Sequence, residues 1–162
     1  MFTNRLFNIS FAIVLLSLIA IRSIGLAAFP HPEAGGTFVT TSTTVHSAME
    51  DKFNTIIDLS STVTYTGTLE GTSTVQGTLT VYRDDSAKFK GVEVFTGLVN
   101  GIPGTLTFEL EGNNDVYQAV QLTDAITSGT GALANLQGKF SKIGIVKDNG
   151  PIGTYTAQIT NQ

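Results

Sequence analysis

The sequence of 162 residues predicts an all-β fold, a single eight-stranded antiparallel up-and-down β-barrel. The clearest observation is the alternation over 72–82, where Val75, Leu79 and Val81 share one parity and threonines dominate the other. Neighbouring side chains on a strand point to opposite faces, so this pattern is typical of a strand with one apolar and one hydroxyl-rich face. The same rhythm recurs from about Phe38 to the C-terminus and is interrupted by short turns, without a sizeable helical segment.

The predicted strands follow one another with short connections. The first is rich in threonine and ends before the charged patch 49–52. The second carries its large apolar residues at one parity, and the third is the alternating stretch described above. The fourth follows the polar turn 83–86, and the fifth alternates leucine and phenylalanine with threonine and glutamate. The last three repeat the pattern. We place the eight strands at about 37–48, 56–69, 72–82, 87–99, 105–110, 116–127, 139–146 and 152–160.

Glycine and asparagine mark the turns. Asn100-Gly101 opens the clearest turn, 100–104, because both residue types tolerate the positive dihedrals of a tight hairpin. A glycine-punctuated segment, 128–138, connects the sixth strand to the seventh. Its start is only superficially similar to a phosphate loop, since the lysine that such a loop needs is absent. We interpret it as a turn whose glycines allow a close approach of the backbone.

Closure of the sheet follows from these short connections. Short turns make neighbouring strands antiparallel, and a flat eight-stranded sheet would leave two unpaired edges. Closure into an up-and-down barrel removes them. An eight-stranded barrel is either filled by its own side chains or holds one small ligand. The main structural alternative is a two-sheet sandwich.

The N-terminus is interpreted as a targeting segment ahead of one folded domain. Arg5 supplies positive charge, 6–21 is mostly apolar, and small residues near Ala28 suit a signal peptidase. The alternative is an uncleaved anchor, because the apolar run approaches the length of a membrane span. We therefore predict a signal peptide or membrane anchor at 1–28, a linker at 29–35 and the β-barrel domain at 36–162. The barrel is expected to be secreted or periplasmic, or else anchored outside the cytoplasm, with membrane contact only through 1–28 if the leader is uncleaved.

Composition excludes several classes of function. The chain has no cysteine, which excludes disulfides, thiolate catalysis and cysteine-ligated zinc. Its formal net charge is -4 and it has no lysine or arginine cluster that could follow a phosphate backbone, so we expect no nucleic-acid partner. His31 and His46 are far apart in sequence and give no metal-ligand spacing, which favours linker and surface roles. We expect no metal and no cofactor.

Three stretches together resemble one family. They are 65–71, which reads Tyr-Thr-Gly-Thr-Leu-Glu-Gly, 89–108, which begins Phe-Lys-Gly-Val-Glu, and 128–138, which is the most specific. They resemble a family of bacterial proteins of unknown function that adopts an allene-oxide-cyclase-like β-barrel, and the match covers about 36–159. The resemblance implies the barrel and a shared but unassigned role. Members of that family tend to carry a histidine in the final strand, whereas 153–158 contains none.

Glu93 is the leading candidate for chemistry. It shares a strand parity with Phe89 and Phe95, although the opposite parity contains Val92 and Val94. If Glu93 faces an apolar interior, desolvation raises the pKa of its carboxyl unless a donor compensates. A carboxyl in that state can act as a general acid or base. The structural alternative is a carboxylate bonded to a hydroxyl of a neighbouring strand or to an arginine.

Asp124 is the second anomalous carboxylate. Val120 and Leu122 share its parity, but its place near the end of a strand favours the barrel rim, within reach of solvent. Two inward carboxylates could form an acid/base pair of the kind that glycosidases use. The sequence gives no reason to place Glu93 and Asp124 together.

Five aromatic residues are expected either to fill the barrel or, if it is hollow, to line it. They are the predicted ligand-binding residues Tyr65, Phe89, Phe95, Phe108 and Tyr155.

Three functions remain open at this point. The first is an exported barrel of unassigned role that binds a small apolar ligand in its interior. The second is an isomerase or cyclase acting on an apolar substrate, with Glu93 as the catalytic residue that polarises or deprotonates it. The third is a structural domain with a filled barrel. An interior void above roughly 300 Å³ would favour the first two. The outer strand faces also leave a homo-oligomer open.

Overall fold

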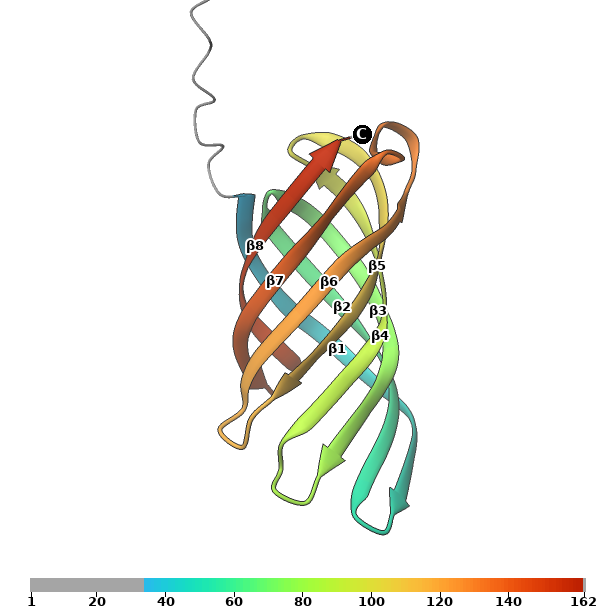
Figure 1. The fold of residues 1–162 in the computed structure, drawn as a ribbon, viewed down its shortest axis with the longest axis vertical. Helices are drawn as coiled ribbons and strands as arrows, with labels where there is room; N and C mark the ends of the chain where they lie inside the picture. The colour runs from blue at the N-terminus through green and yellow to red at the C-terminus, as the bar shows by residue number, and fades with distance from the viewer. Residues whose placement is uncertain (1–33, 162) are drawn as a thin grey trace, which may run out of the picture. The chain divides into compact units, whose positions relative to one another are not determined.

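The computed structural model describes residues 34–161 and contains a closed antiparallel barrel (Figure 1). Each strand pairs with its neighbours in chain order, and the last strand pairs with the first. The strands are β1 Ala34–Asp51, β2 Asn54–Gly67, β3 Leu69–Tyr82, β4 Ala87–Val99, β5 Ile102–Asn114, β6 Ala119–Gly129, β7 Leu136–Lys147 and β8 Gly150–Asn161. Within the described residues the only helix is the short 3-10 helix η1, Gly131–Leu133, between β6 and β7.

The predicted barrel is confirmed, and the alternative of a two-sheet sandwich is wrong. All eight predicted strands are present, and β4 has the predicted bounds. The bounds of β1 differ at both ends, because it begins at Ala34, inside the predicted linker, and runs through part of the predicted loop 49–52. The reason is that the β1–β2 ladder continues to the pair Asp51–Asn54, which leaves only a two-residue turn.

The Asn-Gly turn between β4 and β5 has the expected backbone. Asn100 and Gly101 have φ angles of 50° and 79°, which are the left-handed dihedrals of a tight hairpin. Pairing resumes at once between Val99 and Ile102. The turn is therefore shorter than the predicted 100–104, and its last three residues belong to β5.

The two ends of the barrel differ. The β1–β2, β3–β4, β5–β6 and β7–β8 hairpins lie at one end, here called the open end, and the β2–β3 and β4–β5 connections lie with η1 at the other, the closed end (Figure 1). Leu133 of η1 is buried against the sheet. A Cβ at Gly104 would lie 2.7 Å from Leu133 Cδ1, and one at Gly129 would lie 2.2 Å from the Leu133 carbonyl oxygen. This close approach confirms that the glycines of 128–138 serve a turn, and it explains how η1 seals the barrel.

The packed core occupies the closed half. Aromatic rings meet there edge to face, with the Phe108 and Phe140 centroids 5.3 Å apart and those of Tyr65 and Phe95 5.9 Å apart. Full burial of each such side chain stabilises the fold by about 1.5–3 kcal/mol. The largest fully buried apolar side chains of the described residues are Phe38, Phe95, Phe108, Phe140, Leu69, Leu106 and Leu133.

The seam that closes the barrel is short. β8 pairs with β1 over Ala34–Val39, whereas the β1–β2 ladder runs on to Asp51. Among the described strands, the part of β1 from 41 to 51 therefore has a ladder partner on one side only. The β1–β2 hairpin projects beyond the barrel at the open end (Figure 1).

Several predictions fall at or beyond the limits of the described chain. The predicted signal peptide or anchor, 1–28, and His31 lie outside the described residues. From 34 to 161, no helix has the length and apolar composition needed to cross a membrane. His46 is exposed on β1, with its Nε2 2.9 Å from Ser60 Oγ, which confirms the predicted surface role.

Candidate functional site

The open half of the barrel contains a cavity of about 610 Å³. Its mouth lies among the hairpins of the open end, because Asp85, Gln118 and Asn149 line it. Its floor lies against the packed core, where Glu93 and Lys142 line it. The wall between them is mostly apolar. The apolar side chains of the wall include Ile57, Leu59, Leu79, Val81, Phe89, Val120 and Leu122.

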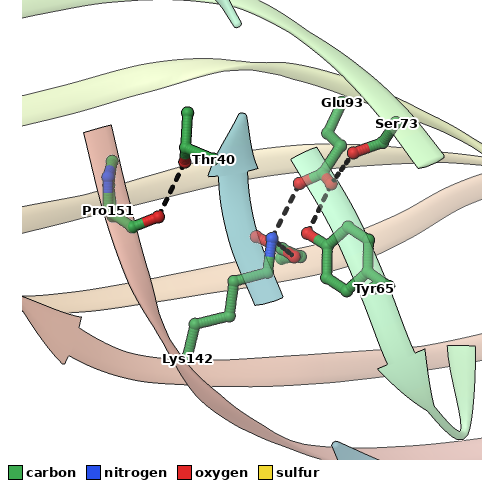
Figure 2. Close-up of polar contacts among 7 residues, drawn as sticks. Thr40, Tyr65, Ser73, Glu93, Lys142 and Pro151 are labelled. Carbon is green, nitrogen blue, oxygen red and sulfur yellow. Dashed lines mark hydrogen bonds and ion pairs between the residues drawn. The ribbon is translucent and has the colours of Figure 1, made fainter. Parts of the chain in front are cut away.

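Three charged side chains meet at the floor, and we call them the ion cluster. Lys142 Nζ lies 2.7 Å from Glu93 Oε2 and 2.5 Å from Asp124 Oδ2. The exposed fractions are 3% for Lys142, 0% for Glu93 and 2% for Asp124, so neither ion pair is screened by bulk water. Figure 2 shows the Lys142 ammonium directed at the Glu93 carboxylate. The cluster joins β4 to β6 and β7 across the barrel.

Two hydroxyls and two aromatic rings complete the surroundings of the cluster. Tyr65 Oη donates a hydrogen bond of 2.5 Å to Glu93 Oε1, and the Ser73 hydroxyl donates to the same oxygen (Figure 2). Lys142 Nζ lies 5.0 Å from the centroid of the Tyr65 ring and 5.7 Å from that of Phe38. Ring faces at such distances attract a cation. Glu93 therefore has donors on both oxygens.

Strand register explains why these charges are inside. Glu93 pairs with Phe108 of β5, and Asp124 pairs with Phe140 of β7. Paired residues point to the same face of a sheet, and both phenylalanines are core residues. Lys142 follows Phe140 by two residues, so it also faces inward and lies diagonally opposite Asp124.

Glu93 keeps its negative charge despite complete burial. Burial alone would raise the pKa of this carboxyl. The Lys142 ammonium and the hydrogen bonds from Lys142, Ser73 and Tyr65 outweigh that effect, and the pKa of Glu93 is lowered from its ordinary value. The predicted rise in pKa is therefore cancelled by the compensating donors.

Asp124, unlike Glu93, has a raised pKa. Burial is the main reason that its pKa rises to about 7, and the Glu93 carboxylate adds to the rise, while Lys142 opposes it. Asp124 Oδ1 is buried and has no hydrogen-bond partner among the described residues, so none of their hydroxyls supports its ionised form. One ammonium cannot neutralise two carboxylates, and the carboxylate with fewer donors takes up the proton first.

Lys142 and Tyr65 hold their protons. Burial alone would lower the pKa of Lys142, but Glu93, Tyr65 and Asp124 raise it well above the ordinary value. Burial raises the pKa of Tyr65 well above its ordinary value, and this effect outweighs the opposing influence of Lys142. The ammonium and the phenol are thus donors throughout the neutral range.

The structure places the two predicted carboxylates together. Glu93 is interior, and its partners include the hydroxyls that the structural alternative required, with a lysine in place of an arginine. The predicted rim position of Asp124 is wrong, because its side chain is 2% exposed. The sequence analysis missed Lys142, Ser73 and the role of Tyr65 as a donor. Strand parity counted from Phe140 could have identified Lys142 as an inward residue.

The five predicted ligand-binding rings are divided between the two halves. Phe89 lines the cavity. Tyr65, Phe95, Phe108 and Tyr155 belong to the packed core of the closed half. The phenol of Tyr155 is tied to the backbone there, because it accepts a hydrogen bond of 2.8 Å from the Leu69 amide and donates to the Thr66 carbonyl.

The cluster does not have the composition of a metal centre. Its two carboxylates already share an ammonium ion, which occupies the place where a cation would bind. Among residues 34–161, no group of three or more histidine, cysteine, aspartate or glutamate side chains could hold a metal ion.

Comparison with known proteins supports the family that the three sequence stretches resemble. A family model described as "Protein of unknown function (DUF3224)" matches residues 34–156. A crystal structure of a protein of unknown function from the same family in Shewanella oneidensis is similar, with 17% sequence identity and a TM-score of 0.61 over 81% of this chain and 97% of that one. At that identity the likeness establishes the fold alone. No curated protein matches the chain.

Proposed function

Because the chain belongs to the DUF3224 family, whose function is unknown, we propose a function from the cavity itself: the barrel binds a small apolar ligand in its open half. The observation that carries this proposal is the mostly apolar cavity of about 610 Å³. Pockets that hold small molecules have volumes of roughly 300–1,000 Å³ and bury most of the ligand surface.

The wall of the cavity supplies the driving force for binding. Transfer of apolar surface from water contributes about 25 cal/mol per Å², and Leu59, Leu79 and Leu122 offer such surface to a ligand. Because η1 and the packed core seal the closed end, the mouth among the hairpins serves both entry and exit. This arrangement favours a binding barrel over a fully packed structural domain.

The isomerase or cyclase alternative requires Glu93 to exchange a proton with a substrate. Both oxygens of Glu93 already accept hydrogen bonds, and the pKa of the carboxyl is lowered, which makes it a weaker base. These contacts favour a carboxylate that holds the floor of the cavity in place. Binding is therefore the function that the geometry supports best.

We also propose that the protein acts outside the cytoplasm. The support is the charged start, apolar run and small residues of 1–28. Mass spectrometry of the mature protein tests this directly. Loss of about the first 28 residues is expected for a cleaved signal peptide, and a mature chain that begins at Met1 would remove that reading.

A cavity-filling variant tests the binding proposal. Leu79 and Leu122 both line the cavity, so the double variant Leu79→Trp/Leu122→Trp reduces its volume from two strands. Binding is measured with the fluorescent apolar probe N-phenylnaphthylamine. We expect the variant to bind the probe at least about tenfold more weakly than the natural chain does.

The matched control places the same residues on the outer surface. Gln76 and Gln121 are exposed on the same two strands, so Gln76→Trp/Gln121→Trp should bind the probe as the natural chain does. Equal loss in both variants, or no binding by the natural chain, would refute the proposal. Native mass spectrometry of protein purified from its source identifies the ligand class, because a retained molecule adds its mass to that of the chain.

A further inference from the structure

We propose that the cavity selects an uncharged ligand, an apolar molecule with a hydroxyl, carbonyl or ester oxygen, and discriminates against carboxylates. This inference rests on the proposed binding function and names its ligand class. The observations behind the inference are the signs and positions of the charged side chains that line the cavity. These side chains lie at the floor and at the mouth.

At the floor, the positive charge is already balanced. Lys142 is in contact with the carboxylates of Glu93 and Asp124. With Glu93 ionised, the net charge of the ion cluster is zero when Asp124 is protonated and negative when Asp124 is ionised, so it is never positive. A ligand carboxylate placed there would be a further anion beside one cation. An uncompensated buried charge is strongly unfavourable.

At the mouth, the charges do not attract an anion either. Within 34–161, the charged side chains that line this end are Asp85, Asp148 and Lys147, so carboxylates outnumber ammonium groups here as well. The remaining polar side chains at the mouth include the amides of Asn113 and Gln118. A carboxylate turned towards solvent therefore meets no net positive charge, whichever way the ligand lies.

The floor still offers a donor to an uncharged oxygen. An ammonium group has three N–H donors. Two are directed at Glu93 and Asp124, and the described residues offer the third only the ring faces of Tyr65 and Phe38. Because Lys142 lines the cavity, that third donor can bond to a hydroxyl, carbonyl or ester oxygen at the inner end of a ligand.

The test compares ligands of similar length whose head groups are uncharged or negatively charged. Decanol, methyl decanoate and decanoate each have a linear decyl or decanoyl chain. Their binding to the full natural chain is measured by displacement of N-phenylnaphthylamine at about pH 8, where a carboxylic acid is ionised. We expect decanol and methyl decanoate to displace the probe at concentrations at least about tenfold lower than decanoate does.

A change of charge at the floor should reverse this preference. In Glu93→Gln/Asp124→Asn the shapes are kept and Lys142 is left as the sole charge of the cluster, so decanoate should bind at least about tenfold more tightly than to the natural chain. The control Asp58→Asn/Glu109→Gln removes two exposed carboxylates and should leave the preference unchanged. Circular dichroism checks that each variant is folded. The comparison of the three compounds in the natural chain does not depend on the variants.

The outcomes separate this inference from the binding proposal. Decanoate binding as tightly as decanol would overturn the inference and leave the binding function standing. If none of the three compounds nor the probe binds, the binding function itself fails. If Glu93→Gln/Asp124→Asn is folded and keeps the original preference, the ion cluster does not set the ligand class, and the inference is overturned as well.

Discussion

The ion cluster predicts an unusual dependence of stability on pH. The pKa of Asp124 is about 7 in the fold, against an ordinary value of 3.8. A carboxyl whose pKa is raised on folding binds more protons in the folded chain, so the free energy of unfolding decreases as pH rises from 3.8 to about 7. Stability from this group is therefore present at low pH and lost towards neutrality.

The magnitude follows from the two pKa values. They differ by about 3, and each pH unit contributes about 1.4 kcal/mol, so the full effect is about 4 kcal/mol. Glu93 has the opposite sign, because its lowered pKa adds stability above 4.5 that is lost at more acid pH. The window from about pH 5 to about pH 7 isolates Asp124 and should show a decrease of about 2 kcal/mol, because the slope falls to about half its full value as the pH reaches the folded pKa.

Urea unfolding at a series of pH values measures this slope. In Asp124→Asn the slope between about pH 5 and pH 7 should vanish, because the titrating group is absent. Glu111→Gln is the matched control, since Glu111 is 66% exposed and 3.9 Å from Lys90, and its slope should equal that of the natural chain. A natural chain whose stability rises over this window, or an Asp124→Asn variant that keeps the slope, would refute the reasoning.

Two further predictions concern residues that hold the two ends of the interior. Lys142→Met leaves two buried carboxylates without a cation and should lower the free energy of unfolding by about 3–5 kcal/mol at neutral pH. Urea unfolding measures this loss. A loss smaller than that of a surface lysine variant such as Lys88→Met would contradict the stabilising role of the two ion pairs. Leu133→Ala removes the side chain with which η1 covers the closed end, and it should lower the free energy of unfolding by about 2–5 kcal/mol. Thermal unfolding measures this change, and an unchanged midpoint would show that η1 does not seal the barrel.

Alternation was sufficient to predict the barrel, and it made Glu93 a candidate for the inward side without deciding between the two faces of its strand. Strand parity is a local property, and in β4 it is supported by Phe89 and Phe95. The position of a residue along the barrel axis is a different property. The sequence did not show that Asp124, near the end of its predicted strand, lies in the packed interior, because the true β6 continues to Gly129.

The inward orientation of Lys142 could not be recognised from the residues next to it in the sequence. Ile143 and Ile145 are 61% and 44% exposed on the outer face of β7, so hydrophobicity in this strand favours the wrong side. Within the predicted strand 139–146, the correct side can be recognised from Phe140 and Val146, which share the parity of Lys142. The meeting of β4, β6 and β7 at one point depends on closure of the barrel, which no local pattern encodes.

Among residues 34–161, the short seam between β8 and β1 leaves a length of β1 that pairs with another strand on one side only. From 41 to 51, β1 presents an open side next to exposed Val45 and Met49, which is where an extended segment of another chain could attach by hydrogen bonding. Glu50, Asp51 and Lys52 at the hairpin tip oppose such growth, since stacked copies would place like charges together. Neutral residues at these three positions would therefore convert a soluble hairpin into a nucleus for aggregation.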